Sequence, residues 1–466
     1  MENYPEFFES IEKAASVFRR WDKEKKISLI SHLDADGISS CAILTKLMND
    51  ENRKYTISIL TQLSERKIKE IAKDNSDYII FSDLGSGQIK DIAKNLGDKE
   101  IIILDHHEPD KLDKEYKNIT HINPHLFGID GSKEIAGAGV CYLFAKCINK
   151  TYENLSHLAI IGAIGDIQED KGFKELNKEI LKTAVDNKLI KVKKSLRIFG
   201  INTRPIHKAL EYSTDINIPG VSGSESGAIQ FLYELGINPK KDNNWKTLNQ
   251  LSDDEVKKLV TGIIMKRLGK IKPDDVLGDS YAILTHEEDS TRDAREFATL
   301  LNACGRMEKA SVGIGVCLGE KKDIQRAMQV LADYKKEIVN AIEWYKSNEK
   351  GEFVIRGNNY IIINAQDRIK STVVGTLASI ISKSDFVSDK TYIMSLAKSE
   401  EEYTKLSLRM KKLEEGDDLR KIVKEIALRV GGEAGGHMSA AGALIPLGRE
   451  KEIIEAAKEV LGKTIL

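Results

Sequence analysis

The feature that most constrains this chain is an apolar run, Ile101 to Leu104, that ends abruptly in Asp105-His106-His107. Three β-branched residues in a row are typical of a strand buried on both faces of a sheet. Pro109 prevents the segment from continuing as a central strand. Ligands of open α/β sheets bind outside the carboxyl ends of the strands, so these polar side chains lie where a site is expected. A histidine pair in a solvated turn is the alternative for this segment alone.

Three other segments in the first half also end an apolar run with acidic or imidazole side chains. Residues 27–31 run into a His-x-Asp-x-Asp-Gly segment, residues 78–82 run into an aspartate, and the apolar helix at 155–164 ends in Gly-Asp. Strands alternating with helices of about ten residues predict βαβ units and a parallel sheet. The residues gathered at these four ends are His32, Asp34, Asp36, Asp83, Asp105, His106, His107 and Asp166.

Mixed carboxylate and imidazole side chains in this arrangement predict a dinuclear metal site. Carboxylates without a nearby Lys or Arg in sequence repel one another and raise each other's pKa values, and divalent cations relieve that repulsion. The ligand types suit two Mn²⁺ ions, with Mg²⁺ as the alternative, whereas a zinc site more often contains Cys. Two such ions about 3.5–4 Å apart form the usual clamp for displacement at phosphorus. The simpler alternative is that each aspartate only caps a helix.

The length of 466 residues predicts two or three domains, because one core does not grow that large. A hydrophobic content of 41% with 31% charged residues is typical of a soluble globular protein. The net charge of -1 indicates no polyanion partner for the whole molecule, although a basic groove facing an acidic metal cluster would also sum to nothing. Five scattered cysteines without a C-x-x-C pair predict small core residues in a reducing cytosol. We expect neither a signal peptide nor a membrane span, and hence a cytoplasmic location.

The middle of the chain is predicted to be mostly helical. Residues 172–196 are rich in Lys and Leu and predict a helix that leaves the first domain, and residues 321–347 predict a long linking helix. Between them, a helix at 292–306 carries Arg295 near its start and Arg306 at its end. These two arginines are candidates for phosphate contacts. Neutralisation of the neighbouring Glu296 and Glu308 is the alternative.

The C-terminal part contains a glycine-rich stretch, residues 431–437, that ends in a histidine. Glycines allow successive backbone N–H groups to converge on an anion, so we expect a phosphate-binding loop. The alternation of residues 405–409 predicts a strand with two polar side chains on one face. The candidate substrate-binding residues of this part are Ser407, Arg409, Gly435, Gly436 and His437.

The four motifs of the first half, in this order and spacing, resemble those of the DHH phosphoesterase superfamily. The resemblance implies that His32, Asp34 and Asp166 bind one manganese ion, that Asp36 and His106 bind the other, and that Asp83 is shared. It implies that His107 contacts the scissile phosphate while Asp105 orients the histidine pair. The C-terminal stretches resemble a DHHA1 domain. The implied organisation is a parallel-sheet α/β DHH domain (1–190), a mostly helical insertion with linker helices (191–345) and a smaller α/β DHHA1 domain across a cleft (346–466).

The segment around residues 292–306 and the overall length are similar to archaeal RecJ-like nucleases, including those associated with the GINS replication complex. The resemblance implies a Mn²⁺-dependent exonuclease on single-stranded DNA or RNA, acting in replication or repair. The chain departs from bacterial RecJ because it leaves no room for the extra oligonucleotide-binding domain of those enzymes. The alternatives are a phosphodiesterase for short or cyclic dinucleotides, a pyrophosphatase, and a replisome scaffold; the glycine-rich C-terminal stretch argues against the pyrophosphatase.

Overall fold

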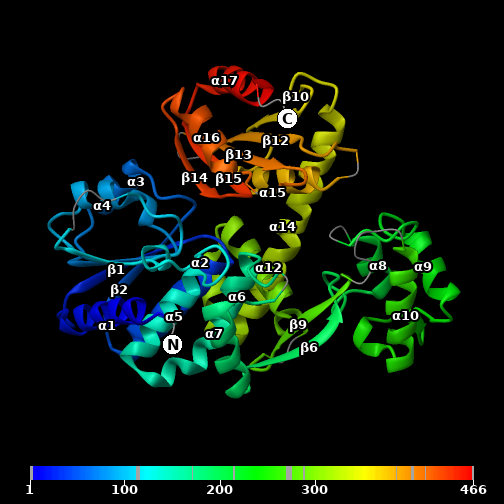
Figure 1. Ribbon diagram of the computed structural model, residues 1–466, viewed down its shortest axis with the longest axis horizontal. Helices are drawn as coiled ribbons and strands as arrows, with labels where there is room; N and C mark the ends of the chain where they lie inside the picture. The colour runs from blue at the N-terminus through cyan, green and yellow to red at the C-terminus, as the bar shows by residue number, and fades with distance from the viewer. Residues whose placement is uncertain are drawn as a thin grey trace.

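The computed structural model describes residues 4–111, 116–170, 172–213, 216–268, 275–286, 289–384, 386–399, 403–414 and 416–463. It has three parts (Figure 1): a first lobe that begins at the N-terminus, a C-terminal lobe beside it, and a mostly helical side module formed by residues 197–276. No described helix combines the length and the apolar character needed to cross a bilayer. The five cysteines are free, and all except the partly exposed Cys147 are buried.

The first lobe is built on a five-stranded parallel sheet with the order β2-β1-β3-β4-β5, as the alternating pattern predicts. Its two central neighbours, β3 and β4, consist almost entirely of buried apolar residues, because helices cover both faces. All carboxyl ends therefore meet at one edge of the sheet. The strands are β1 (Lys26–His32), β2 (Lys54–Leu60), β3 (Tyr78–Ser82), β4 (Glu100–Leu104) and β5 (Ile119–Ile122).

Successive residues of these strands face two different helical layers. In β3, Ile79 and Phe81 pack in the smaller layer, which contains the helices α3 and α4, and Ile80 packs in the larger layer. The larger layer also includes α12 and α13, which follow the side module in sequence. The helices are α1 (Pro5–Arg20), α2 (Ala35–Asp50), α3 (Glu65–Ile71), α4 (Ile89–Asn95), α5 (Gly137–Ile148), α6 (Ser156–Gly165), α7 (Glu175–Asp186), α12 (Ala294–Arg306) and α13 (Ala310–Cys317).

The predicted continuous helix over residues 172–196 is wrong beyond Asp186. Helix α7 ends there, Lys188 has a φ of 56°, and residues 190–196 form the strand β6. This strand pairs in antiparallel fashion with β9 (Leu277–Ile283). The alternation of apolar and charged residues from Ile190 to Lys193 has the period of a strand, and only the distant partner makes that period decisive.

The side module extends from this two-stranded ribbon and has a hydrophobic core of its own (Figure 1). Ser224 caps its helix α9 by accepting the N–H of Gly227. A short strand pair, β7 (Lys240–Lys241) and β8 (Asn244–Trp245), precedes its last helix. Its helices are α8 (Ile206–Glu211), α9 (Glu225–Glu234) and α10 (Asp253–Lys266), and the short α11 (Asp289–Arg292) follows the ribbon.

The long helix α14 (Lys321–Asn348) leads into the C-terminal lobe, as its periodicity predicts. That lobe contains a six-stranded mixed sheet with the order β10-β11-β12-β13-β15-β14, in which only β11 and β12 are parallel neighbours. The strands are β10 (Val354–Arg356), β11 (Tyr360–Gln366), β12 (Tyr392–Lys398), β13 (Tyr403–Met410), β14 (Glu433–His437) and β15 (Ala440–Pro446). The helices are α15 (Ser371–Ser382), α16 (Leu419–Leu428) and α17 (Glu450–Lys463).

Residues 433–437 of the glycine-rich stretch form the edge strand β14 and not the predicted loop. Gly435 pairs with Gly442 of β15. A Cβ atom on Gly442 would lie 2.7 Å from the carbonyl oxygen of Leu406 in β13, so the close approach of these strands requires glycine there. Glycine disfavours strands by its own propensity, which explains why the sequence pattern predicts a loop.

Candidate metal centre

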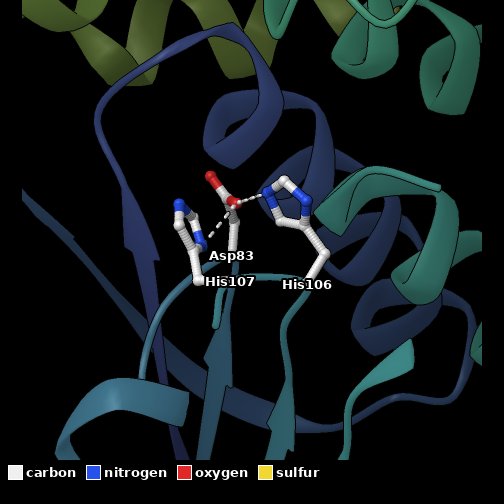
Figure 2. A group of neighbouring side chains, drawn as sticks. All are labelled: Asp83, His106 and His107. Carbon is white, nitrogen blue, oxygen red and sulfur yellow. Dashed lines mark ion pairs between the residues drawn. The ribbon is translucent and has the colours of Figure 1, made fainter. Parts of the chain in front are cut away.

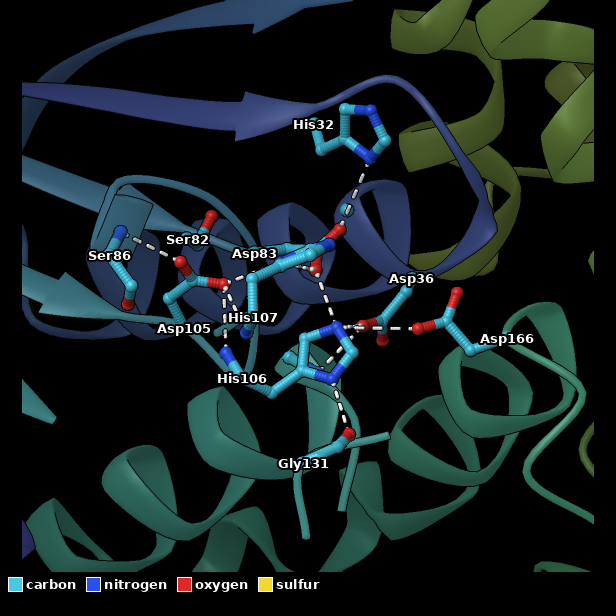
Figure 3. A network of polar contacts seen from close by, with 12 residues as sticks. His32, Asp36, Ser82, Asp83, Ser86, Asp105, His106, His107, Gly131 and Asp166 are labelled. Carbon is cyan, nitrogen blue, oxygen red and sulfur yellow. Dashed lines mark hydrogen bonds and ion pairs between the residues drawn. The ribbon is translucent and has the colours of Figure 1, made fainter. Parts of the chain in front are cut away.

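Loops that follow β1, β3 and β4, together with the end of α6, place the eight predicted residues at one edge of the first sheet (Figure 3). Their ligand atoms form three overlapping groups in which all atoms lie within 4.8 Å of one another. The groups are Asp83 with His106 and His107, His32 with Asp34 and Asp83, and Asp36 with His106 and Asp166. Asp105 lies behind the histidines and contacts them.

Asp83 occupies the middle of this cluster (Figure 2). Its Oδ1 lies 3.2 Å from Nε2 of His106 and 3.8 Å from Nδ1 of His107, and its Oδ2 lies 3.5 Å from Nδ1 of His32. The side chain is 1% exposed, and neither oxygen accepts a hydrogen bond from the described residues. Its φ of 56° turns the chain sharply at the end of β3. Buried polar atoms are normally paired, so this carboxylate has the position and the free lone pairs to bridge two cations.

Asp36 is fixed from the other side of the cluster by the start of α5. Its carboxylate accepts the N–H groups of Gly137 at 2.6 Å and Ala138 at 2.9 Å, which are otherwise unpaired at a helix N-terminus. Oδ2 remains 3.5 Å from Nε2 of His106. A Cβ atom on Gly162 of α6 would lie 2.2 Å from Oδ1 of Asp36, so the carboxylate fits only because this helix position is glycine.

Both histidines of the Asp-His-His segment are oriented by groups outside the cluster. Nδ1 of His106 lies 2.7 Å from the carbonyl oxygen of Gly131, which can only accept, so the ring N–H is at Nδ1 and Nε2 faces the carboxylates. Nδ1 of His107 lies 2.8 Å from Asp105, which also accepts the N–H of Ser86. Such outer contacts fix the tautomer and the direction of metal-binding imidazoles.

The electrostatics of the cluster call for added positive charge. Burial, Asp83 and Asp166 raise the pKa of Asp36 well above its usual range, and burial together with nearby carboxylates raises that of Asp166 to about 7. Burial alone would lower the pKa of His106, but Asp83, Asp166 and Asp36 outweigh it and raise the pKa. The buried atoms without a hydrogen-bond partner include both oxygens of Asp83, Nε2 of His106 and Nδ1 of His32. Oxygen and imidazole donors left unpaired in this way fit divalent cations.

The C-terminal lobe contacts the first lobe beside this cluster. The ring of His437 lies 4.8 Å from that of His107 and 6.0 Å from that of His106, between ring centroids. Burial and these two histidines lower the pKa of His437 to about 3, so its ring is neutral. Gln62 donates to the carbonyl oxygen of Glu433 at 3.3 Å, which holds β14 against the loop after β2.

Three cations gather on the C-terminal lobe and the adjoining end of α12. Ser407 and Arg409 lie on one face of β13, as the alternation predicts. Arg409 donates to oxygen atoms of Ser379, Leu408 and Ala441, none of which is a carboxylate. Burial and Arg306 lower the pKa of Arg409 to about 10, and burial with both arginines lowers that of Lys405 to about 8. A buried group of like charges without an acidic partner favours an anion.

The two arginines of the predicted 292–306 helix have different surroundings. Arg306 donates to the carbonyl oxygen of Thr372 at 3.0 Å and lies beside the cation group. Arg295 forms a 3.0 Å ion pair with Glu169, which is mostly buried. The first arginine therefore remains a candidate for phosphate contacts, whereas the second is engaged by a carboxylate.

Several supporting residues carry no local sequence signal. Gln168 donates to the Gly131 carbonyl at 2.9 Å, the same oxygen that orients His106. Asn302 of α12 accepts the N–H of Ala35 at 3.0 Å and so fixes the His-x-Asp-x-Asp segment. Only the folded structure brings these residues to the site, because they lie far from the motifs they support. Lys405 differs, since the strand alternation alone places it on the face of Ser407 and Arg409.

Three domain families match the chain in the order of its structural parts. The DHH family, N-terminal domain, matches residues 26–165, the DHH-CID domain matches residues 198–277, and the DHHA1 domain matches residues 357–463. An uncharacterized protein of Methanocaldococcus jannaschii is 35% identical over 445 residues, which cover 94% of each chain.

Several solved structures share the fold at low sequence identity. RecJ of Thermus thermophilus in complex with Mn²⁺ has a TM-score of 0.58 and 14% identity; the match covers 98% of this chain but 55% of that one. An exonuclease RecJ bound to manganese has a TM-score of 0.56 and 15% identity, with 97% and 94% of the two chains covered. CDC45 of Entamoeba histolytica has a TM-score of 0.66 and 13% identity, with 98% and 99% covered.

Proposed function

Because the chain belongs to the RecJ-like DHH/DHHA1 superfamily, whose members are metal-dependent phosphoesterases, we propose that it is an exonuclease of single-stranded nucleic acid. The substrate is DNA or RNA, and the cofactors are two Mn²⁺ ions, with Mg²⁺ as the alternative. The observation that carries this proposal is the contact of His437 with His107, which joins the carboxylate-imidazole cluster to the C-terminal lobe. That lobe also contributes the cations near Arg409.

The carboxylates and imidazoles divide into binding and orienting groups. His32, Asp34 and Asp166 would hold one cation, Asp36 and His106 the other, and Asp83 both. Divalent cations bound there neutralise phosphate charge and make a water nucleophilic at neutral pH. Asp105 keeps His107 pointed at the cluster through its 2.8 Å contact, so that the ring can donate to a phosphate oxygen.

The C-terminal lobe is proposed to hold the end of the strand. Arg409, Ser407 and Arg306 would pair with the terminal phosphate, because guanidinium groups match phosphate geometry. His437 is held neutral and so can donate from its ring N–H without adding charge beside the cations. Gly435 and Gly436 leave β14 without bulky side chains along this surface. Phosphate contacts of this kind carry no base information, so little sequence preference is expected.

The test is cleavage of a single-stranded 20-mer, labelled at either end in separate reactions, with Mn²⁺, Mg²⁺ or EDTA. Metal-dependent release of mononucleotides from one end supports the exonuclease and gives its polarity. Hydrolysis of dinucleotides without cleavage of the 20-mer would instead support a small-substrate phosphodiesterase. DNA and RNA versions of the oligonucleotide decide the sugar preference.

A replisome role is a second candidate, favoured by the likeness to CDC45 over nearly the full length of both chains. A partner such as the GINS complex would then dock on this protein, and docking is compatible with cleavage. Capture of partners on the immobilised protein, followed by the 20-mer assay on the same sample, separates the roles. Capture without cleavage would leave a scaffold as the better description.

A further inference from the structure

Ile167, the residue directly after Asp166, has a backbone conformation that is unusual for its side chain. Its φ is 60°, in the left-handed region, and among the described residues it is the one β-branched residue with such a φ. Left-handed φ in a β-branched residue is a genuine outlier and costs free energy. The side chain is nevertheless 70% exposed.

The hydrogen bonds around Ile167 show which residue the fold itself would prefer. Helix α6 ends with the N–H of Gln168 donating to Ala163 at 2.9 Å and the N–H of Ile167 donating to Ile164 at 3.0 Å. This pair of bonds is the Schellman ending, in which the left-handed position is usually glycine. Glycine would adopt the same backbone without strain.

Packing in the folded protein does not offset this cost, because most of the isoleucine side chain faces solvent. Its position is nevertheless well defined. Asp166 on one side lies 3.3 Å from Nε2 of His106, and Gln168 on the other side is buried and bonded to Gly131. An apolar side chain is therefore held rigidly next to the metal cluster, at a cost to the fold.

We propose that Ile167 determines substrate preference by packing its side chain against the nucleobase next to the scissile phosphate. This inference rests on the proposed nuclease function and extends it from the phosphates to the base. The carboxylates and cations of the site account for the charged backbone, and Ile167 supplies an apolar surface for the uncharged ring. Burial of that surface depends on the presence of a base but not on which base, because every base has an apolar face.

Variants at this position separate the base contact from structural effects. Ile167→Gly removes the side chain and relieves the strain, so we expect Tm to rise by about 2 °C. Since this variant is more stable, a loss of activity cannot come from unfolding. Ile167→Leu keeps an apolar side chain and should retain the wild-type KM. Lys188→Gly is the matched control, because Lys188 has a φ of 56° at the same kind of helix end, on α7.

The substrates are the 20-mer and a 20-mer without a base on the nucleotide next to the first cleaved bond. On the intact substrate, Ile167→Gly should raise KM about five- to tenfold with little change in kcat, the effect of exposing part of one apolar side chain. On the abasic substrate, the variant and the wild type should have the same KM, and Lys188→Gly should match the wild type on both.

An unchanged KM in Ile167→Gly on the intact substrate, or an equal rise on both substrates, would overturn the base contact while leaving the nuclease function in place. Failure of the wild type to cleave or bind the 20-mer with any metal would overturn the nuclease function and this inference together. Wild-type cleavage of the intact 20-mer distinguishes these two outcomes.

Discussion

The imidazole of His437 lies 4.8 Å from the imidazole of His107, although the two belong to different lobes. One ring is oriented by Asp105 and the other extends from the edge strand β14. A phosphodiester held at the metal cluster is therefore within reach of groups from both lobes, and the reaction depends on how the lobes meet.

Replacing His437 should affect catalysis but not metal binding. We expect His437→Ala to lower kcat/KM on the 20-mer about 10- to 100-fold, the usual range for loss of one phosphate-directed donor. The rise in Tm produced by Mn²⁺ should stay at the wild-type value, because His437 is outside the three ligand groups. Partial recovery in His437→Gln would identify hydrogen-bond donation as the function, and a lost Mn²⁺ response would show that the residue supports the metal centre.

Removing the shared carboxylate should abolish the response to metal. Mn²⁺ is expected to raise the Tm of the wild type, because binding to the folded state alone stabilises it. Asp83→Asn keeps the shape but loses the charge, so the Mn²⁺-dependent rise in Tm should largely disappear and cleavage should fall about 100-fold or more. Asp98→Asn, an exposed residue of the same lobe, is the control. A normal Mn²⁺ response in Asp83→Asn would contradict a bridging role.

Gly162 is predicted to be essential for both packing and the metal centre. In Gly162→Ala, the new Cβ would lie 2.2 Å from Oδ1 of Asp36 and 2.6 Å from Cβ of Ala138, so atoms must move. We expect a loss of about 1–3 kcal/mol in the free energy of unfolding and weaker Mn²⁺ binding. Gly462→Ala in α17 meets nothing within 4 Å and should gain about 0.5–1 kcal/mol. Urea unfolding compares the two variants, and equal stabilities would contradict the crowding.

Arg409 is predicted to recognise the end of the strand. Arg409→Ala should raise KM about tenfold for a 20-mer with a terminal phosphate, the cost of losing one charge-assisted contact. A 20-mer ending in a hydroxyl should show a smaller change. Arg429→Ala is the control, because that arginine pairs with Glu425 and Glu459 on the same lobe. Equal effects of Arg409→Ala on both substrates would separate the residue from the terminal phosphate.

Glu296 of α12 should make stability depend on pH. Burial raises its pKa to about 7, although Thr203 of the side module donates a hydrogen bond to it and Arg204 and Lys335 lie near. The folded protein therefore holds this proton up to about pH 7, whereas the unfolded chain releases it near its usual value. Stability from this group is complete below that usual value and is lost as pH rises through 7.

The Glu296→Gln variant should lack this loss. Between pH 5 and pH 8.5, we expect the free energy of unfolding of the wild type to fall by about 2 kcal/mol more than that of the variant. Urea unfolding at both pH values gives the difference. Parallel pH profiles would show that the carboxyl group is not protonated in the folded protein.

The position of the candidate metal centre could be predicted from local patterns, because each of its parts follows an apolar run that forms a strand or helix by itself. Asp83 and the Asp-His-His segment end neighbouring parallel strands, and the topology brings such ends together. The two wrong predictions, at residues 190–196 and 433–437, concern segments whose strand structure depends on partners distant in sequence or on glycines. A pattern within one segment does not contain that information.

The ribbon of β6 and β9 also bears on how this molecule could be rebuilt. Leu196 and Leu277 are opposite each other at its outer end, so the chain leaves and returns at almost the same point. Directly opposed residues of antiparallel strands have Cα atoms only about 4.5–5.5 Å apart. A tight hairpin turn could therefore replace the side module, whose core is separate, without moving the rest of the chain. The module is in effect a removable cassette, and its exchange between relatives would alter what the protein meets while leaving the cluster around Asp83 as it is.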